Sequence, residues 1–188
     1  MSRYEEIDFA ALPVRRLNPL QMPSHAGFRP RRGEFGTYWK QGKIARECTA
    51  SICACWYLDV DGVLAAYITL ISDRLLVESP LLEAEKVRYR SFPAIKIGLL
   101  AADQRAKGAG TALMKWAFRY IACELCPRVG ARFVTVDALF DPDNDYDVAG
   151  YYEKFGFVFA DPSGVPREGE QFRTMFFDLK PLLDALDT

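Results

Sequence analysis

The pattern of apolar residues along the middle of the chain predicts a group of strands followed by a long helix. The segments 49–58 and 63–71 are rich in β-branched and aromatic residues, and the Asp61-Gly62 pair between them is a frequent hairpin turn. The run 93–101 is mostly apolar, which is typical of a strand buried in the centre of a sheet. We therefore expect an antiparallel pair of strands followed by a central strand.

A helix is predicted over residues 109–126, where apolar side chains recur every three or four positions and form one buried stripe. Pro127 and Gly130 predict its end. The run 132–139 predicts another strand, so that the order strand, helix, strand indicates a right-handed parallel crossover. The helical stripe consists of Leu113, Trp116, Ala117, Tyr120, Ile121 and Leu125.

Shorter elements are predicted on both sides of this central part. A short helix near 147–155 ends at Gly156, and strands over 157–160 and 172–179 form a hairpin. Towards the N-terminus we expect a strand over 5–12, a helix over 34–47 and a further helix within 81–88. The fold class is thus α/β, with a mixed sheet of about six to seven strands flanked by helices.

The composition favours one globular domain over residues 1–188, because half of the residues are hydrophobic and can fill a core. No apolar run is long enough to cross a bilayer, and the first residues lack the basic start and apolar stretch of a secretion signal. We therefore expect a cytoplasmic protein with no membrane partner. The five cysteines, an odd number, fit a reducing compartment better than a disulfide framework.

Neither charge nor cysteine spacing predicts a further site. The 24 basic and 25 acidic residues leave no overall field that would attract nucleic acid. The basic cluster 29–32 and the acidic run 141–147 are interpreted as solvated loops. The pairs Cys53/Cys55 and Cys123/Cys126 fall in a predicted strand and a predicted helix, whereas zinc knuckles lie on tight turns. We therefore expect buried thiols and no metal.

The segment Arg105–Thr111, with the sequence RAKGAGT, lies between the central strand and the long helix and predicts a pyrophosphate-binding loop. Glycines allow the backbone to approach a ligand closely, and the N-terminus of the following helix attracts negative charge. The alternative is an ordinary strand-loop-helix joint with a glycine turn. An anionic cofactor is the expected ligand.

Two motifs in this order resemble the GNAT superfamily of acetyltransferases. The loop Arg105–Gly110 is similar to the family pattern Arg or Gln-x-x-Gly-x-Gly or Ala. The segment Tyr151–Phe157, with the sequence YYEKFGF, looks like the family's aromatic-Tyr-Glu-Lys-x-Gly-Phe segment. The resemblance covers roughly residues 50–160 and implies acetyl-CoA as cofactor, with a core over 49–180 and a variable acceptor-side region over 1–48.

The resemblance also implies which residues contact the cofactor. On the central strand, Leu100 and Ala102 are expected to face it, although the loop from Asp103 to Gly108 is about two residues shorter than in relatives. Many relatives have an asparagine one turn before the tyrosine, where this chain has Asn144 and Asp145. The expected cofactor-binding residues are Leu100, Ala102, Arg105, Ala106, Lys107, Gly108, Ala109, Gly110, Thr111 and Asn144.

In this family the acceptor amine attacks the thioester carbonyl directly, and no covalent enzyme intermediate forms. The matching position makes Tyr152 the expected acid that protonates the departing thiolate, although a tyrosine on an apolar helix is most often a packing residue. Asp137, on a predicted strand, is the candidate general base, and a salt-bridged carboxylate or water-mediated deprotonation is the alternative. His25, the only histidine, is interpreted as a loop residue.

Three acceptors or functions stay open at this stage. The first is a primary amine of a small molecule or a protein. The second is the amino group of charged tRNA, as in toxin-type relatives that the segment 67–72 resembles, although a net charge of −1 offers little basic surface. The third is a non-catalytic relative that binds acyl-CoA. A homodimer is also expected, because Trp39, Trp56 and Phe172 are large for one core.

Overall fold

The computed structural model describes residues 3–76, 86 and 91–186. The chain divides into two compact units, Met1–Ile71 with Ile97–Ile121 and Ser72–Lys96 with Ala122–Thr188. Each unit is built around its own part of the sheet. The expectation of one domain over the whole chain stays a prediction.

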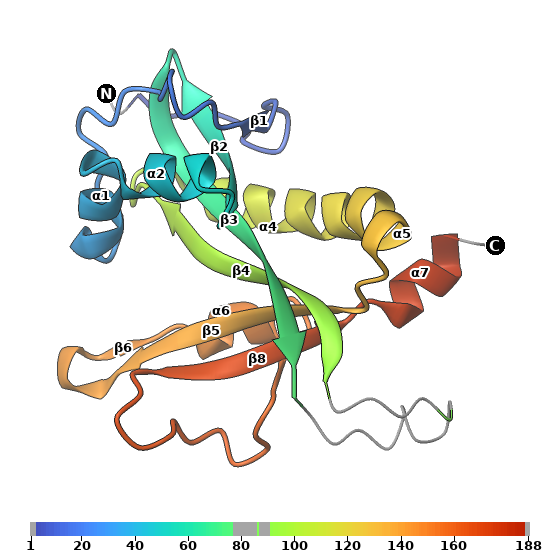
Figure 1. Cartoon of the computed structure of the whole chain (residues 1–188). Coiled ribbons are helices and arrows are strands. Elements are labelled where there is room, and N and C mark those ends of the chain that lie inside the picture. The colour runs from blue at the N-terminus through green and yellow to red at the C-terminus, as the bar shows by residue number, and fades with distance from the viewer. Residues whose placement is uncertain (1–2, 77–85, 87–90, 187–188) are drawn as a thin grey trace. The chain divides into compact units, whose positions relative to one another are not determined.

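The sheet of the first unit contains β1 (Arg15–Arg16), β2 (Ala54–Val60), β3 (Val63–Leu75) and β4 (Phe92–Ala102), and the last two strands continue into the second unit (Figure 1). Strands β2 and β3 pair antiparallel, as the sequence predicts. Asp61 and Gly62 connect them with φ angles of 52° and 74°. Two successive positive φ values are those of a tight hairpin turn.

Two short helices cover part of this unit, and they correct the prediction of one helix over 34–47. The helices are α1 (Gly33–Lys40) and α2 (Lys43–Thr49). Gly42 lies between them with φ 66°, a left-handed conformation that does not continue a helix. The strand predicted over 5–12 is also wrong: these residues form turns, and the first strand is β1.

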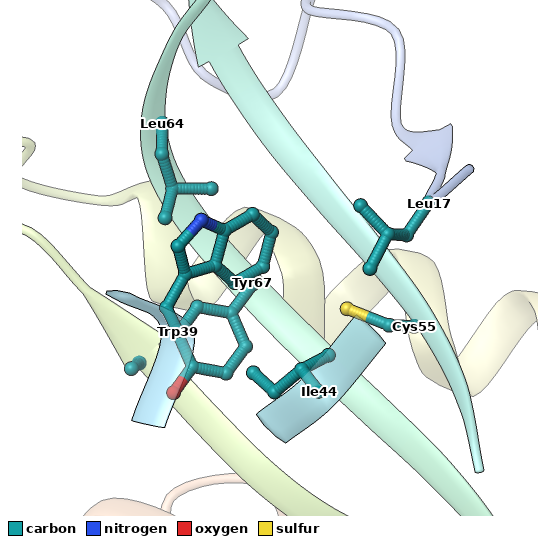
Figure 2. Close-up of a cluster of buried hydrophobic side chains, with 7 residues drawn as sticks. Leu17, Trp39, Ile44, Cys55, Leu64 and Tyr67 are labelled. Carbon is teal, nitrogen blue, oxygen red and sulfur yellow. The ribbon is translucent and has the colours of Figure 1, made fainter. Parts of the chain in front are cut away.

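The core of the first unit is a cluster around Trp39 of α1 and Tyr67 of β3 (Figure 2). Their ring centroids are 5.0 Å apart, and both side chains are almost completely buried. Ile44 of α2 lies in the same cluster, which fixes both helices to the sheet. The other buried members are Leu17, Cys55, Leu64 and Ala101.

Helix α4 (Ala109–Tyr120) follows β4 and confirms the predicted helix. It buries Ala109, Leu113, Met114 and Ala117, while Trp116 and Tyr120 stack on one another at 4.9 Å. A π-helical turn, η1 (Ile121–Leu125), and the short α5 (Cys126–Val129) continue it to Gly130. The helix therefore passes Pro127, which lies in the first turn of α5, and ends at the predicted glycine.

The second unit contains the strand pair β5 (Phe133–Asp141) and β8 (Phe172–Asp178), which run antiparallel, with Asp137 opposite Thr174. Its strand order is β4-β5-β8-β7. As predicted, β7 (Val158–Phe159) and β8 form an antiparallel pair. The remaining elements are η2 (Pro142–Asn144), β6 (Tyr146–Asp147), α6 (Ala149–Glu153) and α7 (Lys180–Leu186).

The predicted α/β class with a mixed sheet is confirmed. The described residues form eight strands, of which β1, β6 and β7 are two residues long, and these short strands account for the larger number. The helix predicted within 81–88 falls outside the described residues, apart from position 86. No helix in the described part of the chain is both long enough and apolar enough to span a membrane.

Two of the three large aromatic residues from which a homodimer was predicted fit within the core of a single chain. Trp39 and Trp56 are buried within the chain, whereas Phe172 is half-buried. The homodimer stays a prediction.

Candidate active site

The glycine loop lies at the N-terminus of α4, in the first unit. Gly108 is the N-cap of this helix and has a φ of 90°, a conformation that favours glycine. A Cβ atom at this position would meet no atom within 4 Å, so the space next to Gly108 is open. The sequence needs a glycine here because of the backbone angle and not because of crowding.

Four amides of this loop are available to a ligand. The amide of Ala106 donates to the carbonyl oxygen of Asp103 at 2.9 Å, and that of Ala109 donates to Ala106 at 3.1 Å. Within the described residues, the amides of Lys107, Gly108, Gly110 and Thr111 have no hydrogen-bond acceptor. Free amides at a helix N-terminus bind anions, so the loop fits the diphosphate of a coenzyme A molecule.

Arg105 has a different role from the rest of the loop. Its Nε and Nη2 atoms donate to the two carboxylate oxygens of Asp103, each at 2.8 Å, and its backbone amide donates to Oδ1 at 3.0 Å. Nη2 also donates to the carbonyl oxygen of Gly27 at 2.5 Å, and the guanidinium lies 5.6 Å from the ring centroid of Tyr4. The Arg105 side chain therefore stabilises the loop through its contacts with Asp103 and Gly27 and is not directed towards a ligand.

Asp103 is the centre of this network, and its side chain is fully buried. Burial by itself raises the pKa of this carboxyl, but hydrogen bonds from the Arg105 side chain and from the amides of Arg105 and Arg29 outweigh burial and hold the pKa below its ordinary value. The carboxylate is therefore ionised at neutral pH. This role of Asp103 was not predicted from the sequence, where its position two residues before Arg105 is the only local signal.

The end of β4 presents the two residues expected to face the cofactor. Leu99 packs against the Trp39 cluster and Ala101 belongs to it, so Leu100 and Ala102 point to the other side of the strand, where both are half-exposed. The Leu99 amide donates to Oγ1 of Thr69 at 2.8 Å. This arrangement agrees with the expected orientation, and cofactor contact stays a prediction.

Tyr152 lies on α6, in the second unit, and is 8% exposed. Burial raises the pKa of its hydroxyl, and electrostatic interactions with Tyr151, Tyr146 and Asp137 act in the same direction. The hydroxyl therefore keeps its proton at neutral pH. No described residue forms a hydrogen bond with it, which leaves the proton available to another acceptor.

Asp137, the candidate base, is engaged on both carboxylate oxygens. Oδ2 forms an ion pair with Nζ of Lys96, and Oδ1 accepts a hydrogen bond from Oγ1 of Thr174 at 3.0 Å. The side chain is about three-quarters buried, and its charge acts on Tyr152. Asp137 and Tyr152 thus lie in the same unit. The Asp137 carboxylate is salt-bridged, which was the alternative to its role as general base. The contacts of Lys96 and Thr174 with Asp137 were not predicted from the sequence.

Asn144 lies in η2 and not on the helix that carries Tyr152. Its Nδ2 atom donates to both carboxylate oxygens of Asp141, at 3.1 and 2.9 Å. Asp145 follows with a φ of 50°, which ends the turn. A role of Asn144 in cofactor binding stays a prediction.

No family model matches the sequence, and no curated protein matches it. Solved structures do match over nearly the whole chain. AtaT complexed with acetyl-methionyl-tRNAfMet has a TM-score of 0.73 and 19% sequence identity, over 94% of this chain and 99% of that chain. A tyrosine-to-phenylalanine mutant of KacT has a TM-score of 0.73 and 19% identity, over 93% and 98%. AtaTR bound with acetyl-CoA has a TM-score of 0.68 and 19% identity, over 94% and 98%.

AtaT and KacT are GNAT toxins. This chain has the GNAT fold. Within the GNAT fold of this chain, the glycine loop precedes helix α4 and Tyr152 lies on the short helix α6. The resemblance inferred from the two sequence motifs is thus confirmed at the level of the fold, while the roles of individual residues stay predictions.

Replacing Gly108 with alanine is expected to weaken coenzyme A binding about tenfold. Alanine at a left-handed φ costs about 1–2 kcal/mol, and relief of this strain would turn the loop amides away from the ligand. Calorimetry with coenzyme A measures the effect. Gly130→Ala is the matched control, because Gly130 also has a positive φ and open space around it but lies at the end of α5. Equal affinities for the two variants would contradict the assignment of the loop.

Proposed function

We propose that this protein is an acetyl-CoA-dependent N-acetyltransferase whose acceptor is the amino group of an aminoacyl-tRNA. The observation that carries the proposal is the likeness to AtaT in complex with acetyl-methionyl-tRNAfMet, which extends over almost the full length of both chains. The likeness to AtaTR bound with acetyl-CoA supports the choice of cofactor. Of the acceptors considered from the sequence, charged tRNA is therefore favoured over a small amine.

The local charge of the first unit supports an RNA partner, although the net charge of the chain is −1. Between Pro13 and Arg46 the sequence contains eight basic residues, and Glu34 is the one acid. A concentration of positive charge on one segment attracts a phosphate backbone even when the whole chain is neutral. Seven of the eight basic side chains are exposed: Arg15, Arg16, Arg29, Arg31, Lys40, Lys43 and Arg46.

The proposed reaction needs alignment and proton transfer from this chain. Acetyl-CoA supplies an activated thioester, which the acceptor amine attacks directly. The free amides of Gly108 and Gly110 bind the diphosphate of the cofactor and fix its position. Tyr152 holds its proton until the sulfur leaves as a thiolate and then donates it. The attacking amine releases its own proton to water, because Lys96 and Thr174 already occupy the Asp137 carboxylate.

A second candidate acceptor is a small amine, and one cavity favours it. A pocket of about 710 Å³ in the second unit is lined by residues that include the acids Asp161 and Glu170. Thr174, which donates to Asp137, is also part of its wall. An ammonium group could pair with these carboxylates. Arg167 and Arg173 line the same pocket and reduce its preference for cations.

An acetylation assay distinguishes the two acceptors. Purified protein would be incubated with labelled acetyl-CoA and either aminoacylated total tRNA or a panel of amines that includes polyamines, lysine peptides and amino acid methyl esters. We expect label on charged tRNA, sensitive to mild base that cleaves the aminoacyl ester, and little label on the amine panel. Label on a polyamine with none on tRNA would favour the second candidate, and label on nothing would contradict an acetyltransferase.

Expression in bacteria gives an independent readout. If the protein acetylates charged tRNA, inducing it should arrest growth, because an acetylated amino group cannot form a peptide bond. Induction of Tyr152→Phe to the same protein level should permit growth. Equal growth of both cultures would contradict the proposed acceptor.

A further inference from the structure

A positively charged pocket lies on one face of α1, within the first unit. It has a volume of about 360 Å³ and lies between α1 and the preceding segment 25–30. Its wall contains the basic side chains of Arg29 and Lys40, the imidazole of His25 and the hydroxyl of Thr37. No acidic residue lines it. Nothing in the catalytic chemistry described above uses this pocket.

The sequence of α1 produces this open face. Positions 33, 36, 37 and 40 lie on one side of a helix, because they are spaced by three or four residues. Two of them are Gly33 and Gly36. A Cβ atom at Gly36 would lie 3.3 Å from the ring of Pro30, so the glycine allows the segment 25–30 to come close to the helix. Trp39 points to the other side, into the core cluster.

The basic groups of the pocket have no acidic partners. In the part of the chain that the structure describes, the side chains of His25, Arg29 and Lys40 form no ion pair. Glu34, the acid nearest in sequence, is exposed and binds Arg32 through two hydrogen bonds. Two uncompensated cations facing one small cavity repel each other, and an anion in the cavity would relieve this repulsion.

The backbone of the pocket is held in place before any ligand binds. The amide of Arg29 donates to Oδ2 of the buried Asp103 at 2.9 Å, and the carbonyl oxygen of Arg29 accepts from the Gln104 amide at 2.9 Å. Nε2 of Gln104 donates to the carbonyl oxygen of Pro30 at 3.3 Å. A rigid wall lowers the entropy that binding costs, which distinguishes a built site from a chance cluster of surface charges.

We propose that this pocket binds a phosphate ester, through Arg29 and Lys40 with His25 and Thr37 as further hydrogen-bonding groups. Guanidinium and ammonium groups form strong charge-assisted hydrogen bonds with phosphate oxygens. The inference rests on the proposed function, and it deepens that function by assigning a backbone phosphate of the RNA acceptor to a defined pocket. The other source of the same chemistry is the 3′-phosphate of coenzyme A.

The test compares two double variants that remove the same charge. In Arg29→Ala/Lys40→Ala the pocket loses both cations, while the Arg29 backbone amide that binds Asp103 remains. The control Lys115→Ala/Arg119→Ala removes two exposed cations from α4. Thermal unfolding would first establish that both variants fold. The affinity for uncharged, fluorescently labelled tRNA would then be measured over about 50–300 mM potassium chloride.

The expected result is specific to the pocket variant. Its affinity for tRNA should fall about tenfold at low salt, and the slope of log affinity against log salt should decrease by about one to two units, because one or two phosphate contacts are lost. The control should keep the wild-type slope. Equal losses of tRNA affinity in the two double variants would mean that the overall positive charge of the protein, and not this pocket, determines binding. That result would overturn the proposed site.

Calorimetry with coenzyme A and with 3′-dephospho-coenzyme A distinguishes the two sources. If the phosphate belongs to RNA, the pocket variant should bind both cofactors as the wild type does. If the variant loses affinity for coenzyme A but not for the dephosphorylated form, the pocket binds the cofactor phosphate. Unchanged tRNA and coenzyme A binding would overturn the proposal. All these readouts are independent of acetyl transfer, so a chain that binds tRNA but acetylates none would refute the proposed function and keep the site.

Discussion

Tyr152→Phe is expected to lower the turnover of acetyl transfer at least about tenfold, with little change in the affinity for coenzyme A. The substitution removes only the hydroxyl, and the ring contacts with Tyr151 and Phe157, at 5.3 and 5.7 Å between centroids, remain. A thiolate then has to leave without a proton from the protein. Steady-state kinetics with a fixed acceptor and calorimetry with coenzyme A measure the two quantities separately.

The neighbouring tyrosine provides the matched control. Tyr151→Phe removes the same atom from the same helix, and we expect near wild-type turnover, because the family motif assigns the acid to position 152. Equal losses from the two variants would indicate a packing role for the aromatic pair. Unaltered turnover of Tyr152→Phe would remove Tyr152 from the mechanism.

The pH profile provides a further check of the acid. Burial, together with weaker electrostatic interactions with neighbouring groups that include Asp137, raises the pKa of Tyr152 above the ordinary value of about 10 for tyrosine. A raised pKa keeps the proton on the hydroxyl to higher pH, so the rate should show no loss of this acid below about pH 10. A loss with an apparent pKa near 8 that Tyr152→Phe abolished would contradict this account of the side chain.

Asp103→Ala is expected to lower the free energy of unfolding by about 2–4 kcal/mol and to weaken coenzyme A binding. The substitution leaves the backbone amides of Arg29 and Arg105 without their acceptor. It also removes the carboxylate that holds the Arg105 side chain in place. The loop amides then lose the fixed arrangement that a diphosphate requires. Chemical denaturation and calorimetry with coenzyme A measure the two effects.

Asp178→Ala is the matched control for this prediction. Asp178 accepts hydrogen bonds from Nε and Nη2 of Arg132 at 2.9 and 2.7 Å, an arrangement similar to that of Asp103 and Arg105. It lies in the second unit, so its loss should reduce stability without changing the affinity for coenzyme A. If both variants bound coenzyme A as the wild type does, Asp103 would have no role in shaping the loop.

Acid unfolding provides an independent test of the Asp103 carboxylate. A carboxyl whose pKa is lower in the folded than in the unfolded chain contributes stability above the unfolded value of about 3.9, and this contribution disappears as the pH falls through the folded pKa. Asp103→Asn should therefore lose less stability than the wild type when the pH falls below about 4. Parallel pH profiles for the two proteins would contradict a lowered pKa at Asp103.

The elements that were predicted from the sequence have local determinants. The glycine at position 108, the apolar repeat of α4 and the Asp61-Gly62 turn each depend on residues within a few positions. The N-terminal region lacks such signals. Phe9, whose spacing indicated a strand, is instead buried within turns beside Tyr4.

The support of the candidate site could not be predicted, because its partners are far apart in the sequence. Asp103 and Arg29 are separated by 74 positions, and Lys96 and Asp137 by 41. No periodicity connects such residues, and only the folded chain brings them together. The net charge was misleading for a related reason, since the excess of acids elsewhere hides the basic segment between Pro13 and Arg46.

The anchoring of Arg29 by Asp103 has a consequence for the growing chain. When the first hundred residues have been synthesised, the basic segment and helix α1 are already part of the chain, but Asp103, the acceptor for the Arg29 amide, has not yet been added. Arg105, which also binds the Gly27 carbonyl oxygen, is added two residues after Asp103. The segment near position 29 therefore acquires its final conformation only when more than half of the polypeptide has been synthesised, and a prematurely terminated product of that length would carry the positive charge without a cofactor loop.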